Sequence, residues 1–379
     1  MSRKIAPLLW RGIVSIELAV VAMAILMVLV FMCTIAQVKM GTYGAVEHFM
    51  RHFLVWARLG NFEIPVFPGG ALVGLVLTAN LVASLLDRLV WNWRKLGLWL
   101  VHAGLILLFA GEFITAAFQD DMRMTIEEGQ TVGYLESARD VELAIIDTMD
   151  PAFDEVFAIP ATMLAEFVIV DLPSTAISLN VRRFFPNAQL SDRAPSDPTP
   201  LATMGVGTGV NIVEREVTTS DDEDNHVSAL VEPMVAGHSQ GVWLVSQAVD
   251  APQSFSHEGH TYQLSIRPRR SYLPYTISLK KFTHAVYPGT DIPKDFSSLV
   301  HISNPLRGEE RDVLIYMNQP LRYDGKAFYQ ASFGKGDTMS ILQVVENPGW
   351  LLPYVSCVLV TLGLLFHFAL SLRRRKGKG

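Results

Sequence analysis

The stretch LGLWLVHAGLILLFAGEFITAAF, residues 96–118, decides the fold class of this chain. It holds one carboxylate, Glu112, and no lysine or arginine. A helix of this length rises about 1.5 Å per residue and is long enough to cross the roughly 30 Å hydrocarbon core of a bilayer. Gly97, Gly104 and Gly111 recur every seven residues, and such a glycine seam lets another helix approach closely. The stretch therefore predicts a membrane-spanning helix with a packing face.

Three further apolar runs are long enough to span a membrane: Leu18 to Ala36, Gly70 to Leu86 and Trp350 to Leu372. The chain of 379 residues is 50% hydrophobic and 18% charged, with a mean hydropathy of +0.28. Soluble domains usually carry about 25% charged residues. The first run is longer than the apolar part of a signal peptide, so we interpret it as an uncleaved anchor. We expect a membrane protein with four transmembrane α-helices.

Lysine and arginine counts predict the orientation of these helices. Residues 1–17, 87–95 and 373–379 together hold eleven Lys/Arg and two acids. Residues 119–348 hold 17 Lys/Arg against 32 Asp/Glu, a net charge of −15. Cytoplasmic segments of membrane proteins are enriched in Lys and Arg. We therefore place both termini in the cytoplasm of a bacterial-type inner membrane and the large acidic region outside it.

These boundaries divide the chain into six parts. A cytoplasmic tail and the first helix occupy 1–36, and an outer loop occupies 37–69. The second helix and a cytoplasmic loop occupy 70–95, and the third helix 96–118. A large extracytoplasmic β-rich domain occupies 119–348, inserted between the third and fourth helices, and the last helix with a basic tail occupies 349–379.

The outer loop contains apolar residues at helical spacing: Val46, Phe49, Met50, Phe53, Leu54 and Ala57. This pattern predicts an amphipathic helix at the membrane surface. His48 and His52 lie four residues apart on its polar side. They could share a metal or haem, but two polar-face histidines at an interface is the interpretation we favour.

The large outer domain shows short runs of branched and aromatic residues between turn signals. Phe255 to Ile266 predicts a hairpin with Glu258-Gly259 at its turn, and Val313 to Ser332 a second hairpin with Asp324-Gly325 at its turn. Residues 160–171 are the one stretch that we expect to be helical. Residues 186–220 are rich in Pro, Ser, Thr, Asp and Gly, so we expect loops there.

Several function classes are excluded or unsupported. The net charge of −6 and the absence of a basic domain argue against nucleic-acid binding. Cys33 and Cys357 are the two cysteines, so the chain has no dithiol, zinc-ribbon or CxxCH haem motif. The glycine-rich residues 205–209 lack the context of a phosphate loop, and residues 221–224 lack the ligand spacing of a calcium loop. No nucleophile elbow is present, so we assign no catalytic residue.

Three ionisable residues lie inside the predicted spans: His102, Glu112 and His367. Such residues are costly in lipid and are functional candidates by default. Both histidines lie at similar depth in the inner leaflet, and neutral imidazole is an axial ligand of haem iron. His102 is two residues from Gly104, about 200° around the helix. If the seam packs against this chain's own helices, His102 faces a second protein. A histidine hydrogen-bonded within the bundle is the alternative.

The sequence resembles the ResB (CcsB) family of system II cytochrome c biogenesis proteins. The similarity runs over 96–135 and 270–365, in segments beginning LVHAGLILL at residue 100, MTIEEG at 124, YPGTDIP at 287, MNQPL at 317 and NPGW at 347. The resemblance implies a haem-delivery subunit that works with a CcsA/ResC-type membrane protein. Haem would cross the membrane and be joined to the CxxCH motif of apocytochrome c.

Under this resemblance His102 matches the family's span histidine, one axial ligand of a transient b-type haem that is shared with the partner. His367 has no matching role and stays an alternative ligand. The partner's WGxxWxWD motif is absent, so this chain resembles the separate, accessory subunit. Thiol-reducing proteins would be involved only indirectly. Two other functions remain open: an assembly scaffold that binds no haem, and a b-type electron-transfer protein that uses His102 and His367.

Overall fold

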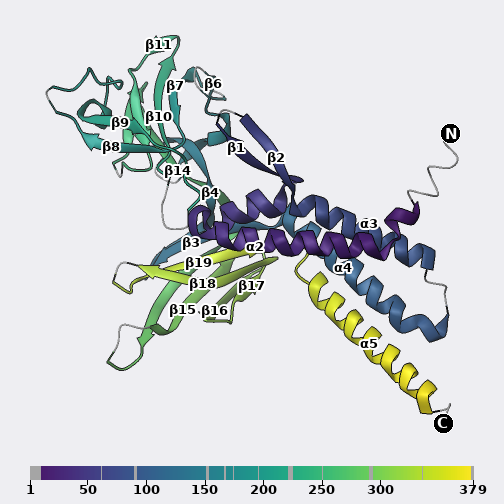
Figure 1. The fold of residues 1–379 in the computed structure, drawn as a ribbon. Coiled ribbons are helices and arrows are strands. Elements are labelled where there is room, and N and C mark those ends of the chain that lie inside the picture. Colours follow the sequence, from purple (N-terminus) through teal and green to yellow (C-terminus); the bar gives the residue numbers. More distant parts are fainter. Residues whose placement is uncertain are drawn as a thin grey trace. The chain divides into compact units, whose positions relative to one another are not determined.

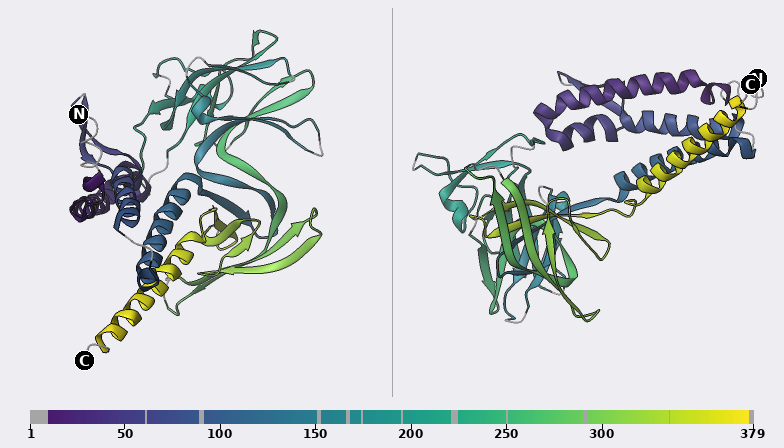
Figure 2. Two further views of the ribbon diagram at one scale, coloured as in Figure 1. Left: turned by 90° about the vertical axis from the view of Figure 1, so that its right-hand side faces the viewer. Right: turned by 90° about the horizontal axis from the view of Figure 1, so that it is seen from below.

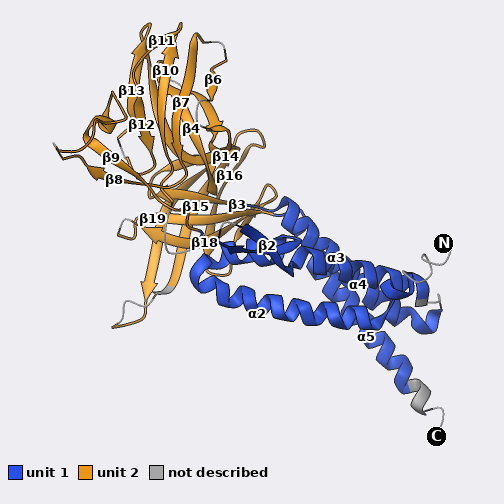
Figure 3. Cartoon of the chain, turned by 45° about the horizontal axis from the view of Figure 1, so that its top comes forward, with its two compact units in different colours: residues 1–120, 219–223, 347–379 blue, residues 121–218, 224–346 orange. Residues whose placement is uncertain are grey.

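The computed structural model describes residues 10–60, 62–88, 92–150, 153–165, 168–173, 175–194, 196–220, 225–249, 251–289, 293–334 and 336–376. The chain divides into two compact units (Figure 3). Unit 1 comprises residues 1–120, 219–223 and 347–379, and unit 2 comprises 121–218 and 224–346. Unit 1 is helical with one small hairpin, whereas unit 2 consists of β-sheets.

Unit 1 holds four helices that are long and apolar enough to cross a membrane, as the sequence predicts. They are α2 (Ile16–Val46), α3 (Gly70–Arg88), α4 (Leu96–Phe118) and α5 (Leu352–Lys376) (Figure 1). Ser15 caps α2, because its Oγ accepts a hydrogen bond from the Leu18 amide at 3.1 Å. The helix extends ten residues beyond the predicted run but is broken at Gly41, where φ is +68°.

The outer loop differs from the prediction of one amphipathic helix. A single π-helical turn, η1 (Glu47–Arg51), follows α2, and the chain then forms a β-hairpin from β1 (Leu54–Leu59) and β2 (Phe62–Pro68). The predicted helix over residues 46–57 is therefore wrong beyond Arg51. Residues 54–59 have cross-strand partners in 62–68. A short apolar stretch does not distinguish the 3.6-residue repeat of a helix from the two-residue repeat of a strand.

Helices α4 and α5 pack along the glycine seam, and they run side by side in both views of Figure 2. A Cβ atom added at Gly97 would lie 2.5 Å from the carbonyl oxygen of Gly363, and one at Gly104 would lie 3.0 Å from that of Ser356. Contacts move down α5 as they move up α4, so the two helices are antiparallel. The Ser356 hydroxyl also donates to the Gly104 carbonyl at 2.7 Å. The predicted seam thus serves a contact within the chain.

Polar side chains fix both ends of this helical unit. Asn80, a polar residue of the second apolar run, is buried and donates from Nδ2 to the carbonyls of Ile13 at 2.6 Å and Ser15 at 2.9 Å. Asn347 precedes α5 and donates from Nδ2 to Thr115 Oγ1 at 3.1 Å near the end of α4. Side-chain hydrogen bonds of this kind join helices in a membrane, where water cannot compete for the partners.

Unit 2 contains three antiparallel sheets. The largest has the order β16-β15-β14-β4-β3-β19-β18-β17, with β13 paired to β14 and β5 to β4. Its strands are β3 (Asp120–Glu127), β4 (Thr131–Asp147), β5 (Glu155–Pro160), β13 (Gln253–His257), β14 (His260–Val286), β15 (Pro293–Asn304), β16 (Glu309–Tyr316), β17 (Leu321–Tyr323), β18 (Lys326–Gly334) and β19 (Met339–Glu346).

The second sheet has the order β11-β10-β7-β6, with β12 paired to β10, and the third joins β8 and β9. Their strands are β6 (Ile169–Asp171), β7 (Ile177–Phe185), β8 (Ala188–Asp192), β9 (Val210–Glu214), β10 (Ser228–Val235), β11 (His238–Ser239) and β12 (Trp243–Ser246). The loops expected over residues 186–220 therefore contain one short strand pair.

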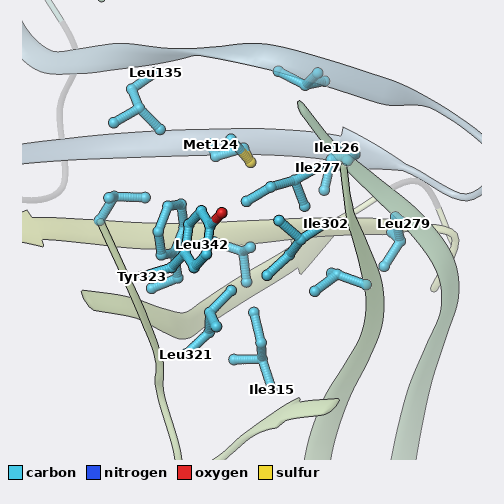
Figure 4. Close-up of a cluster of buried hydrophobic side chains, with 14 of the residues drawn as sticks. Met124, Ile126, Leu135, Ile277, Leu279, Ile302, Ile315, Leu321, Tyr323 and Leu342 are labelled. Atoms are coloured by element: carbon cyan, nitrogen blue, oxygen red, sulfur yellow. The ribbon is translucent and has the colours of Figure 1, made fainter. Parts of the chain in front are cut away.

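Two long strands, β4 and β14, connect the two main cores of unit 2. One core gathers Met124, Ile126, Ile277 and Leu342 with their neighbours (Figure 4), and the other gathers residues such as Leu143, Leu179 and Val231. β14 contributes Ile277 to the first core and Leu264 to the second. Because each strand continues through both cores, the two cores belong to one compact unit.

The two hairpin turns expected in the outer domain are confirmed, whereas the helix expected over residues 160–171 is not. The hairpin turns occur at Glu258-Gly259 and Asp324-Gly325, and both residues of each turn have positive φ, as type I′ turns require. Among the described residues of 160–171, one short 3₁₀ turn, η3 (Ala161–Met163), is helical, and β6 follows it. Residues 221–224 lie outside the described part of the chain.

Candidate functional site

His102 lies on α4 on the side away from the glycine seam. Gly104 is buried against α5, and His102 is two residues earlier, about 200° around the helix. Its side chain is half-buried, and Nδ1 lies 2.8 Å from the carbonyl oxygen of Leu98, one turn back. A carbonyl oxygen can only accept, so Nδ1 must donate. This leaves Nε2 of the neutral ring with its lone pair, which is the form that binds a metal.

His367 lies on the opposite side of α4 from His102. A Cβ atom added at Gly97 would lie 2.9 Å from the Cβ of His367, so His367 belongs to the seam. The imidazole of His367 is half-buried, and its ring centroid lies 5.8 Å from that of Phe368. The structure therefore does not bring the two histidines of the predicted spans to a common site.

Glu112 is exposed on α4, beside rather than within the seam. It follows the seam residue Gly111 by one position, about 100° around the helix. Glu112 makes no hydrogen bond to another described residue. A carboxylate on the outer face of a membrane-spanning helix is costly when it meets lipid. The face of α4 that α5 leaves open thus carries two ionisable groups, His102 and Glu112.

The histidine pair of the outer loop is not arranged to share a metal. His48 belongs to the π-helical turn, whereas His52 follows that turn in extended backbone conformation. Nδ1 of His52 lies 2.6 Å from the carbonyl oxygen of Glu47. Within the described ranges, no group of three or more His, Cys, Asp or Glu side chains is placed to hold a metal ion.

Unit 2 contains a histidine with a buried ring nitrogen that the sequence did not single out. His284 Nδ1 lies 3.0 Å from Asp337 Oδ1, and its Nε2 is buried with no hydrogen-bond partner among the described residues. The rings of Phe296 and Phe333 pack 4.9 and 4.5 Å from the imidazole centroid. Asp337 is 53 residues away, so no local sequence signal predicted the pair. A buried acceptor without a partner costs about 1–3 kcal/mol.

A second histidine of unit 2 is fully hydrogen-bonded. His301 lies 2.6 Å from Asp312 through Nδ1 and 2.7 Å from Glu310 through Nε2. The hydrogen bond to Asp312, followed by that to Glu310, raises the pKa of the His301 imidazole. Both nitrogens are occupied, so this residue stabilises the β15–β16 pair and cannot bind a metal as it stands.

Comparison with known proteins gives two matches. Residues 227–341 match the model of the ResB-like family, and in the structure they extend from the start of β10 into β19. Protein NrfI of Wolinella succinogenes is 33% identical over 104 residues, which is 27% of this chain and 12% of that relative. The family match lies in the part of the chain that forms the sheets, so it does not include His102.

Proposed function

We propose that this chain, which the two matches identify as a ResB-like membrane protein, is a subunit of a haem-delivery complex for cytochrome c biogenesis. The predicted resemblance to the ResB family is supported by the family match over residues 227–341 and by the similarity to NrfI. The four long apolar helices agree with a membrane-embedded subunit. In this proposal the chain receives haem as cargo and passes it towards apocytochrome c.

The free Nε2 of His102 is the observation that carries the proposal. The hydrogen bond from Nδ1 to Leu98 holds the ring in one tautomer and orients it, as the outer hydrogen bond of a metal-binding histidine does. One imidazole supplies one axial ligand. His367 is on the other side of α4, so the second ligand must come from another molecule.

The face of α4 that α5 does not cover favours a membrane protein as that second molecule. It presents His102 and the exposed carboxyl of Glu112, and neither is covered by α5. Haem carries two propionates, whose passage through lipid is unfavourable without a protein wall. A CcsA/ResC-type partner packed on this face would supply the opposing ligand and line the path. The same wall would exclude lipid from Glu112.

The charge distribution supports placing the β-sheets outside the cytoplasm. The segments that flank the helices on one side hold eleven Lys/Arg, whereas residues 119–348 carry a net charge of −15. An acidic surface favours encounter with a basic partner such as an apocytochrome. The cysteines Cys33 and Cys357 lie on separate helices, so we assign reduction of the apocytochrome thiols to other proteins.

The experiment is co-expression of the full chain with a CcsA-type partner, followed by purification and absorption spectroscopy. We expect a b-type haem spectrum in the wild-type complex and in His367→Ala, which is the matched control on the other side of α4. His102→Ala should assemble with the partner but lose most of the haem, and His102→Gly should regain it when free imidazole is added.

Each outcome separates the competing functions. Equal haem in wild type and His102→Ala, with the complex intact, would favour a scaffold that binds no haem through this residue. Equal loss in His102→Ala and His367→Ala, in the chain without a partner, would favour an electron-transfer protein. Failure of any haem-binding partner to associate would contradict the proposal as a whole.

A further inference from the structure

The β1–β2 hairpin has one uniformly apolar face. Residues paired across an antiparallel ladder share a face, and successive residues alternate between faces. The pairs Leu59↔Phe62 and Ala57↔Ile64 therefore lie on one face, and the apolar Val66 follows at the register shift between the pairs Trp56↔Pro65 and Val55↔Phe67. We call these five residues the apolar hairpin face. It holds no charged or polar side chain.

Four of the five residues of the apolar hairpin face are large and exposed, and Ala57 is half-buried. Phe62 is 75% exposed, Leu59 71%, Val66 49% and Ile64 42%. Side chains of this kind in contact with water are unfavourable, and a contiguous patch of them marks an interaction surface. The described residues of unit 1 leave this face open.

The other face of the hairpin has different chemistry. It carries the pair Arg58↔Glu63, whose side chains approach to 3.6 Å and are 77% and 64% exposed, and the pair Trp56↔Pro65. Val55 lies two residues before Ala57 on β1 and so shares the apolar side. It is buried near the base of the hairpin and pairs with Phe67, and both belong to the apolar cluster with the helices of unit 1, so the apolar side is covered at the base and exposed towards the tip. The hairpin is therefore amphipathic and is held firmly at one end.

Chain connectivity brings the hairpin to the surface of the bilayer. The first candidate span ends at Arg51 and the second begins at Gly70. The Gly69 amide donates to the Phe53 carbonyl at 2.8 Å and closes the base of the hairpin between these two spans. Strands of six or seven residues extend about 20 Å. The whole hairpin thus lies within reach of the lipid headgroups.

The backbone limits how deep the hairpin can lie. β1 and β2 form a two-stranded sheet, so each strand has an outer edge without a partner strand. Unpaired backbone groups are not tolerated in the hydrocarbon core but can be hydrated at the headgroup level. Pro65 and Pro68 have no backbone N–H, which reduces the number of unpaired donors on β2.

We infer that the β1–β2 hairpin is a lipid-binding element that lies at the boundary between headgroups and acyl chains, with the apolar hairpin face against the lipid. The ion pair Arg58–Glu63 on the opposite face would contact water and headgroups. This inference does not depend on haem or on a partner. It assigns a bilayer-anchoring role to a segment for which sequence periodicity predicted a surface helix.

Spin-label accessibility in proteoliposomes tests the inference. The full chain with Cys33→Ala and Cys357→Ala would carry one label at each of positions 62 to 66 in turn, through Phe62→Cys, Glu63→Cys, Ile64→Cys, Pro65→Cys and Val66→Cys. The vesicles are made of phosphatidylethanolamine and phosphatidylglycerol. Each label is measured with oxygen, which concentrates in lipid, and with a nickel chelate, which stays in water. Leu362→Cys on the exposed side of α5 is the reference for a lipid-facing site.

We expect the ratio of oxygen to nickel accessibility to alternate with a period of two residues. Labels at 62, 64 and 66 should resemble the label at 362, and the label at 63 should favour nickel. Nickel access that is equal at all five positions would overturn the inference, because the face would then be in water. Immobilised labels at 62 and 64 that neither reagent reaches would also overturn it, because protein would then cover the face. Size-exclusion chromatography of each labelled chain identifies misfolded variants, and the remaining positions still decide the periodicity.

Discussion

Substitution of alanine for Gly97 tests the packing of α4 against α5 most directly. The added Cβ would lie 2.5 Å from the Gly363 carbonyl oxygen and 2.7 Å from the His367 amide nitrogen. Both are backbone atoms and cannot rotate away. Ordinary contact begins near 3.5 Å, so the helices must separate by about 1 Å at this point. Such a gap removes a quarter to a half of the attraction of each contact that it opens.

The magnitude follows from two opposing effects. Overpacking a close contact costs about 1–3 kcal/mol. Alanine stabilises a helix interior by about 1 kcal/mol relative to glycine, and this gain offsets part of the overpacking cost. Gly74→Ala on α3 isolates that gain, because a Cβ atom there meets nothing within 4 Å. We therefore expect Gly97→Ala to be less stable than Gly74→Ala by about 1–3 kcal/mol.

The assay is reversible unfolding of the full chain in mixed micelles of mild detergent and dodecyl sulfate, followed by tryptophan fluorescence. Both variants are compared with the wild type under one set of conditions. If Gly97→Ala unfolds at the same dodecyl sulfate fraction as Gly74→Ala, or at a higher one, the close approach of α4 and α5 at Gly97 is refuted.

Four other substitutions test separate parts of the structure. Asn80→Ala should lower the free energy of unfolding by about 1 kcal/mol in the same micelle assay, because it removes two hydrogen bonds to the start of α2. Tyr323→Phe should lower the free energy of unfolding, measured by thermal unfolding, by about 1–3 kcal/mol, because the Tyr323 hydroxyl donates to the Glu309 carboxylate. Tyr275→Phe should leave that free energy unchanged or raise it, because the buried Tyr275 hydroxyl has no hydrogen-bond partner among the described residues. The pKa of His301 is raised in the folded chain above its ordinary value of 6.5, so the protonated imidazole stabilises the fold at pH values below 6.5. This stabilisation is lost as the pH rises through the pKa of the folded chain. The melting temperature of wild type should therefore fall towards that of His301→Gln as the pH is raised. A constant difference between His301→Gln and wild type across that pH range would contradict this assignment.

The features that the sequence predicted well depend on short-range spacing. Gly97, Gly104 and Gly111 define one side of a helix whatever that side contacts, and the structure confirms that it is a packing face. The turns at Glu258-Gly259 and Asp324-Gly325 need positive φ at both positions, and few residues other than Gly, Asn and Asp adopt it readily. Such signals are contained within a few residues of the chain.

The features that were missed depend on partners that are distant in the chain. His284 meets Asp337 from 53 residues away, and Asn80 meets the carbonyl of Ile13 from 67 residues away. The outer loop was misread because Leu54 and its neighbours gain cross-strand partners, which helical periodicity does not consider. The position of His102 relative to the seam follows from the helical angle alone, but its hydrogen bond to Leu98 depends on the orientation of the imidazole, which residue spacing does not determine.

The pairing of β3 with β19 also sets the order in which this chain can mature. β3 pairs on one side with β4, which follows it directly. β3 ends at Glu127 and β19 begins at Met339, so the ribosome must add more than 200 residues before the first strand of the large sheet has its second neighbour. The glycine seam of α4 likewise has no packing partner until α5, which begins at Leu352, has been synthesised. Long-range strand pairing is slow, and unpaired edges are open to wrong partners in the meantime.

A nascent chain therefore passes through a stage with three inserted helices, an uncovered glycine seam and an incomplete sheet. Insertion of α5 removes the first exposed surface, and docking of β19 removes the second. Assembly factors that hold such intermediates would have to act within this interval. A chain interrupted between β3 and Met339 would keep both surfaces exposed, which makes it a substrate for membrane proteolysis.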